Sequence, residues 1–168
     1  YRTAERSAAV FLNMLDDDEK RAFAELAQRL IEADGLVIGR EAQALASLKA
    51  EMGMGVSESN GRTVDELAGV FSNRRSKVAA LLELIGLGYS DTSFSVNEES
   101  LVNQVANQMA ISPDELADVE DLMHRFKVMM ALEDGDASSA LAHFRTCIAS
   151  TPAQPTIYRV VGIAEDYR

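Results

Sequence analysis

The chain has 168 residues, of which 47% are hydrophobic, and this length and composition suit one globular domain, or two tightly fused halves, with a substantial core. Its 27 acidic and 16 basic residues give a net charge of -11, which argues against nucleic acid as a partner, because phosphate backbones attract cationic surfaces. Cys147 is the only cysteine, so an internal disulfide and a cysteine-built zinc site are both excluded.

No segment is long and apolar enough to insert into a bilayer, and no signal peptide is visible. The single cysteine favours a reducing compartment, so we expect a cytoplasmic protein, with peripheral attachment at the inner membrane face left open. The chain starts at Tyr1 rather than at Met, so it can be a piece of something longer.

Apolar residues recur with a helical period through the first half of the chain. Two capping boxes, Asp16 with Glu19 and Thr63 with Glu66, predict where the first and third helices begin. The second helix is expected to stop near Gly53. The apolar stripes of these helices are Phe23, Leu26, Ala27, Leu30 and Ile31; Leu45, Leu48 and Met52; and Leu67, Val70 and Phe71.

The same period continues through the second half. Ser95 with Glu98 predicts another helix start, and Ser112 with Glu115 predicts the next. The stripes here are Val78, Leu81, Leu82, Ile85 and Tyr89; Leu101, Val105 and Met109; Leu116, Val119, Met123, Phe126 and Met130; and Leu141, Phe144 and Ile148. We therefore expect an all-α bundle of seven to eight short helices. Residues 1–150 would form a single domain, followed by a tail, residues 151–168, of unclear structure.

Two helix–helix junctions repeat one pattern at an offset of 57 residues. The matched pairs are Leu30 and Leu87, Asp34 and Asp91, Val37 and Phe94, Glu41 and Glu98, Leu48 and Val105, and Met52 and Met109. Each junction has an aspartate at the end of one helix, an apolar residue three positions on, and a glutamate in the first turn of the next helix. The offset predicts that residues 16–53 and 76–110 form two related helical hairpins.

The acidic residues of these junctions have two interpretations. Glu98 can cap its own helix together with Ser95, which is a purely structural role. Asp34, however, follows the C-terminal end of a helix, where its charge opposes the helix dipole and would be stabilised by a cation. An EF-hand is not indicated at the second junction, because Val96 and Val102 replace the glycine and glutamate that such a loop requires.

The first junction resembles that of the TerB-like family, named for bacterial tellurite resistance. Its residues Ala33, Asp34, Gly35, Val37 and Glu41 match the family's usual pattern. The second copy keeps Asp91, Phe94 and Glu98 but has Ser90 and Thr92 in place of the alanine and glycine. The similarity covers roughly Asp16 to Phe126.

This resemblance implies an all-α fold of two pseudo-symmetric halves and a non-enzymatic role in a bacterial stress response. It also implies that the junction carboxylates bind a divalent cation, with Asp34, Glu41, Asp91 and Glu98 as oxygen ligands. Calcium or magnesium suits such ligands, and no organic cofactor is expected.

The alternative is a protein-interaction module without metal, similar to the N-terminal region of membrane-anchored J-domain co-chaperones. Its acidic surface would bind a basic partner surface or a membrane-associated complex. A hydrolase based on paired carboxylates is a third interpretation, which would require a pocket and a raised pKa.

Overall fold

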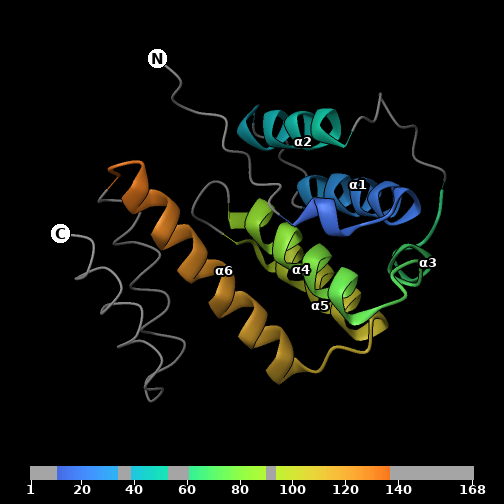
Figure 1. The fold of residues 1–168 in the computed structure, drawn as a ribbon. Helices are drawn as coiled ribbons and strands as arrows, with labels where there is room; N and C mark the ends of the chain where they lie inside the picture. Colours follow the sequence, from blue (N-terminus) through green and yellow to red (C-terminus); the bar gives the residue numbers. More distant parts are fainter. Residues whose placement is uncertain (1–10, 34–38, 53–60, 90–93, 137–168) are drawn as a thin grey trace. The chain divides into compact units, whose positions relative to one another are not determined.

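The computed structural model describes residues 11–33, 39–52, 61–89 and 94–136, and these are mainly helical with no β-strand among them (Figure 1). The all-α prediction is therefore confirmed for this part of the chain. The elements are η1 (Leu12–Met14), α1 (Asp17–Glu32), α2 (Gly39–Glu51), α3 (Val64–Ala68), α4 (Arg74–Gly88), α5 (Val96–Gln108) and α6 (Pro113–Glu133). Within the described residues, none of these helices has the length and hydropathy needed to cross a membrane.

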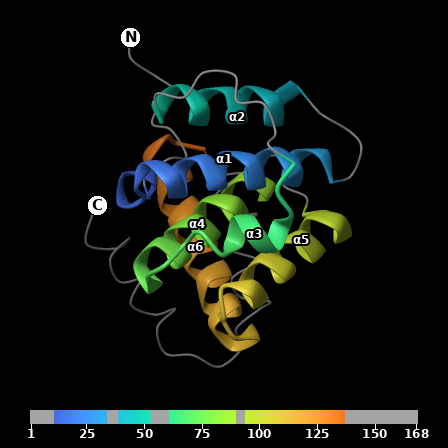
Figure 2. The same cartoon turned by 90° about the vertical axis from the view of Figure 1, so that its right-hand side faces the viewer.

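The chain divides into two compact units, residues 1–120 and 121–168, and the division falls within α6. In the first unit, α1 packs against α2, α3, α4 and α5. Figure 2 shows α2 on one side of α1, and α3, α4 and α5 on the other. The expected domain boundary at residue 150 and the expected helix around Phe144 lie outside the described residues.

The predicted capping boxes account for how most of these helices begin. Asp16 and Glu19 cap α1 reciprocally, Thr63 and Glu66 cap α3, and Ser95 and Glu98 cap α5. At the start of α6, the Ser112 backbone N–H donates to Glu115 at 2.9 Å, and the Glu115 N–H donates to the Ser112 hydroxyl at 3.3 Å. These local signals place helix starts correctly because each satisfies backbone donors that the helix leaves unpaired.

The core of the first unit follows the predicted stripes closely. Leu48, predicted to be buried, is 2% exposed, and Phe23, Leu26 and Leu30 are fully buried. The middle of α4 is buried on almost every side, and Ala79 through Ile85 are each at most 4% exposed. This part of the helix carries no solvent-exposed polar face, because α4 packs against α1, α5 and η1 at once, whereas Arg74 and Arg75 in its first turn are exposed.

Two details of the predicted stripes are wrong. The stripe of α5 was placed on Leu101, but Val102 is the buried residue, at 1% exposed, and Leu101 is half-buried. α3 ends at Ala68 instead of continuing to Phe71, because Gly69 leaves the helix after a last bond to the Asp65 carbonyl. Phe71 is still buried, at 2% exposed, so it fills the core from the turn that follows α3, where its N–H donates to the Ala68 carbonyl at 3.4 Å.

Candidate acidic site at the helix junctions

The four predicted ligands differ in how far the structure describes them. Asp34 and Asp91 lie outside the described residues. Glu41 lies in α2, but its side chain is also outside the description. Glu98 is described in full. The structure does, however, place two of these residues along their helices. Glu41 and Glu98 are each the third residue of the helix that follows its junction, as the repeat predicts.

Of the two interpretations of Glu98, a helix cap or a metal ligand, its described contacts are those of the cap. Its Oε2 accepts a hydrogen bond from the Ser95 backbone N–H at 2.7 Å, and the Ser95 hydroxyl accepts one from the Glu98 N–H at 3.2 Å. The side chain is buried, with 5% of the residue exposed. This carboxylate therefore stabilises the start of α5, while no hydrogen bond to its Oε1 is found among the described residues.

The second junction is held by an aromatic contact. The rings of Phe94 and Tyr89 stack with centroids 4.7 Å apart and an interplanar angle of 13°. The edge of the Phe94 ring also lies directly over Gly88, so that a β-carbon added at Gly88 would overlap it. Phe94 is the apolar residue that the repeat pattern predicted at this position, and it packs the start of α5 against the end of α4.

A pair of carboxylates accompanies this contact. Burial raises the pKa of Glu120, and the negative charge of Glu99 raises it further. Burial also raises the pKa of the Tyr89 hydroxyl, with smaller contributions from the charges of Glu120 and Glu99. Neither Glu99 nor Glu120 forms an ion pair with any residue that the structure describes. Negative charge at this junction is thus left without a cationic partner there.

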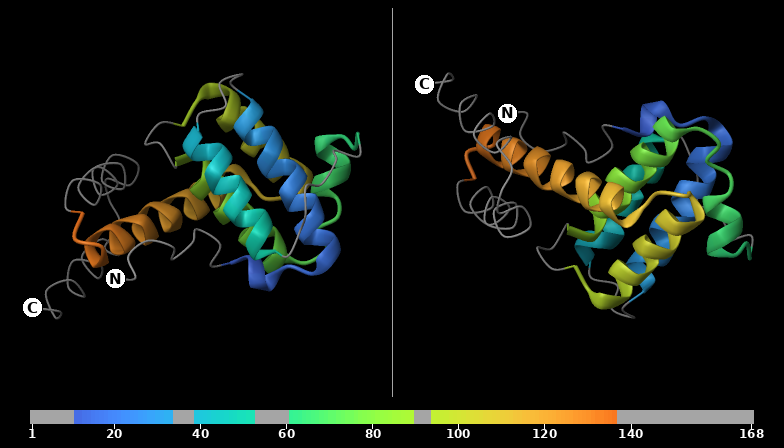
Figure 3. Two further views of the ribbon diagram at one scale, coloured as in Figure 1. Left: turned by 90° about the horizontal axis from the view of Figure 1, so that it is seen from above. Right: turned by 90° about the horizontal axis from the view of Figure 1, so that it is seen from below.

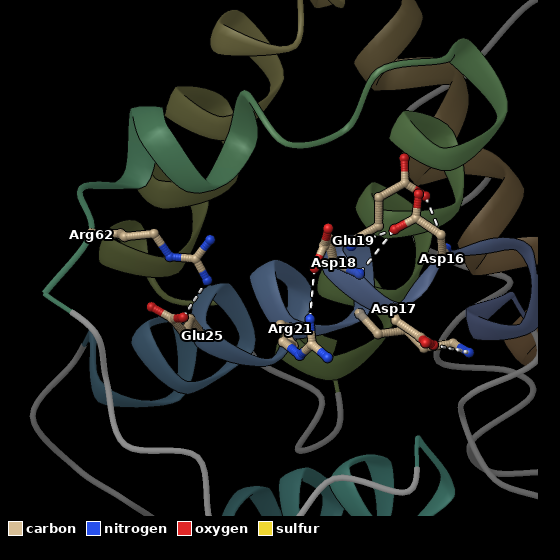
Figure 4. Close-up of polar contacts among 8 residues, drawn as sticks. Asp16, Asp17, Asp18, Glu19, Arg21, Glu25 and Arg62 are labelled. Atoms are coloured by element: carbon tan, nitrogen blue, oxygen red, sulfur yellow. Dashed lines mark hydrogen bonds and ion pairs between the residues drawn. The ribbon is translucent and has the colours of Figure 1, made fainter.

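The other end of the same unit shows the opposite arrangement. Glu25 of α1 is buried, and Arg62, which precedes α3, forms an ion pair with it (Figure 4). Arg29 donates a second bond to the backbone carbonyl of Arg62. A buried carboxylate normally requires such compensation, because its desolvation costs several kcal/mol. At the second junction, by contrast, no such cation lies beside Glu99 or Glu120 among the described residues.

Glu99 and Glu120 were not predicted as site residues. Glu99 lies in the first turn of α5 and Glu120 is the eighth residue of α6, so their electrostatic interaction depends on how these two helices are placed, which local sequence rules do not specify. The available signal was the stretch from Val78 to Met123, which contains no lysine or arginine at all. A carboxylate in such a stretch can form an ion pair only with a cation from elsewhere in the chain, as Glu115 does with Arg74.

The chemistry open to this junction is that of oxygen ligands and paired carboxylates. The described residues include no group of three or more acidic, histidine or cysteine side chains arranged to hold a metal ion. Two of the predicted ligands belong to the segments between those residues, so the site is described only in part. Comparisons of the chain with protein-family models, with curated proteins and with solved structures find no match.

Proposed function

We propose that this chain is a non-enzymatic, TerB-like helical module that binds a divalent cation, Ca²⁺ or Mg²⁺, at its duplicated acidic junctions. The proposed ligands are Asp34, Glu41, Asp91 and Glu98. The setting is a bacterial, cytoplasmic stress response of the kind that the family resemblance implies. The observation that carries the proposal is the uncompensated negative charge of Glu99 and Glu120 beside the second junction.

Electrostatics supports a cation here in a specific way. A raised carboxyl pKa means that the charged form of Glu120 is disfavoured in the folded protein. A divalent cation nearby would favour the charged form and stabilise the fold by binding only to the native state. Hard cations prefer carboxylate oxygens, and Asp91 belongs in sequence to the segment between α4 and α5.

The duplicated arrangement belongs to the same proposal. α1 packs against α2, and α4 packs against α5, so each junction connects two helices in contact. The glutamate is the third residue of the second helix in both cases. These correspondences support two related halves, with the first junction contributing Asp34 and Glu41 as the second contributes Asp91 and Glu98.

The test is thermal unfolding of the chelator-treated protein, with and without added Ca²⁺ or Mg²⁺. At a cation concentration ten times the dissociation constant, stability should rise by about 1.4 kcal/mol, and the melting temperature should rise accordingly. The double variant Asp34→Asn, Asp91→Asn should lose this response. Asp17→Asn is the matched control, because Asp17 is an exposed aspartate in the first turn of α1, and it should keep the full response.

One observation favours the alternative, an interaction module without metal. The Glu98 carboxylate already accepts a hydrogen bond from the Ser95 backbone N–H in its capping box, so its stabilisation does not require a metal ion. In that case the acidic junction would receive a basic surface of a partner protein. A melting temperature indifferent to both cations at millimolar concentration, about the range of weak sites, would replace the metal proposal by this one.

A further inference from the structure

An apolar groove lies between η1 and the first half of α4, away from the acidic junction. The groove has a volume of ≈ 520 Å³. Five apolar side chains line it: Phe11, Met14, Val78, Ala79 and Leu82. The proposed cation site uses none of these residues.

The groove is built by a fixed backbone. The Phe11 backbone N–H donates to Oε1 of Glu83 at 2.7 Å, and Glu83 is almost completely buried in α4. Leu12, the first residue of η1, and Leu15, which follows η1, are each 4% exposed and anchor this turn in the core. η1 is thereby held against α4, while Met14 stays 37% exposed at the edge of the groove.

Positive charge borders this apolar surface. Arg74 and Arg75 occupy the first turn of α4 and line the groove, and no acidic residue lies in that turn. Arg74 pairs with Glu115 at 2.7 Å. Arg75 is exposed and has no ion pair with the described residues. In a chain of net charge -11, this is a local reversal of sign beside exposed apolar side chains.

We propose that this groove is a docking site for an acidic amphipathic helix of a partner protein. Apolar residues spaced three and four positions apart on such a helix would cover Met14, Val78 and Leu82, as helix-in-groove complexes do. Glutamate or aspartate on the flank of the same helix would form ion pairs with Arg74 and with Arg75, which has no ion pair with the described residues. The complementarity therefore selects both the apolar face and the charge of the partner.

Other occupants fit the chemistry less well. An anionic membrane is an extended negative surface and would be repelled by this chain of net charge -11, whereas a single acidic helix would meet mainly the two arginines that line the groove. A nucleic-acid phosphate would find two arginines but would leave the apolar floor exposed to water. The residues that precede Phe11 carry two arginines and one glutamate, so their charge does not complement Arg74 and Arg75. A second copy of the chain is a further outcome that the experiment separates.

The experiment measures fluorescence anisotropy of a labelled peptide mixed with the full chain in chelator. The peptide has about 15 residues, or four helical turns, with leucines along one face and glutamates on both flanks. A twin peptide carries lysine in place of each glutamate. We expect saturable binding of the acidic peptide, about tenfold weaker binding of the twin, and weakening of the acidic complex by added salt.

Two matched pairs of variants locate the binding. Val78→Glu places a charge in the groove and should weaken binding about thirtyfold or more, whereas Val96→Glu, at an 81% exposed valine of α5, should leave it unchanged. Arg75→Glu should weaken it about tenfold, whereas Arg21→Glu, at an exposed arginine of α1 outside the groove, should not. Val78→Ser serves in place of Val78→Glu if circular dichroism shows that the glutamate variant is unfolded.

Several results would overturn the proposal. One is the absence of binding at peptide concentrations up to about 1 mM, which corresponds to the weakest affinity that would count as specific. Another is equal affinity for the acidic peptide and its lysine twin. Equal losses in the Val78→Glu and Val96→Glu variants would also refute it. Sedimentation that shows a dimer abolished by Val78→Glu would assign the groove to a second copy, and binding to anionic vesicles abolished by Val78→Glu would assign it to a membrane. Because the assay contains chelator, failure of the cation proposal would not affect its outcome.

Discussion

Gly88→Ala is a sensitive probe of the second junction, because the space beside this glycine belongs to the Phe94 ring. A β-carbon at position 88 would overlap the edge of that ring, so the ring must move. The ring cannot move freely, since it stacks on Tyr89 with centroids 4.7 Å apart. The substitution therefore forces either strain in α4 or loss of the stacked pair.

The expected magnitude comes from two opposing effects. Loss of the aromatic stack costs about 0.5–1.5 kcal/mol, and overpacking costs about 1–3 kcal/mol if the ring stays in place. Alanine in a helix gains about 0.5–1 kcal/mol over glycine, although Gly88 is the last residue of α4. We expect a net loss of about 1 kcal/mol in the free energy of unfolding.

Urea denaturation of a double-mutant cycle measures this coupling. Phe94→Ala removes the ring, and in that background Gly88→Ala should become stabilising by about 0.5 kcal/mol, the helix-propensity gain alone. The sign of the effect should thus depend on whether Phe94 is present. If Gly88→Ala stabilises both backgrounds equally, the Phe94 ring does not lie over Gly88 and the described junction is wrong.

Two further predictions concern the core and the acidic pair. Leu48→Ala should lower the free energy of unfolding by about 2–5 kcal/mol, because the side chain is buried. The control is Ser47→Ala, at an exposed neighbouring residue. A loss well below about 1 kcal/mol for Leu48→Ala would contradict the burial of this side chain. Glu120 has a pKa raised above its ordinary value of 4.5, so its stabilising contribution is complete below that pH and is lost as the pH rises through the raised pKa. In chelator, Glu120→Gln should therefore match the wild type in acid and become the more stable protein as the pH approaches neutrality, which urea denaturation across a pH series would check. A difference between the two proteins that does not change with pH would show that Glu120 is not perturbed.

Sequence patterns predicted those parts of the fold that depend on neighbouring residues. The capping pairs, such as Ser95 with Glu98, are three residues apart, so their geometry is set by the first helical turn itself. The burial of Leu48 followed from its helical stripe. The same reasoning placed the α5 stripe on Leu101 instead of Val102, because both are apolar and only packing chooses between them.

The candidate site was harder to predict, because it depends on contacts between distant segments. Glu99 and Glu120 are brought together by packing, and neither belongs to the repeated junction pattern. Conversely, Glu98 does belong to that pattern, and its described contacts are those of a helix cap. The groove beside Arg75 also requires η1 to pack onto α4. The buried carboxylate of Glu83 supports this packing by accepting a hydrogen bond from the Phe11 backbone N–H, 72 residues away in the chain.

The burial of the middle of α4 has a consequence for how the first unit opens. A helix with one side exposed along its whole length can fray or detach while its neighbours stay folded, but α4 packs against α1, α5 and η1 together, and Ala79 through Ile85 are all buried. The backbone amides of these residues should reach water only when those neighbours separate, so their exchange with solvent deuterium should follow global unfolding. α2 packs on α1 from the opposite side (Figure 3), so it can open alone, and its amides should exchange faster than those of the middle of α4.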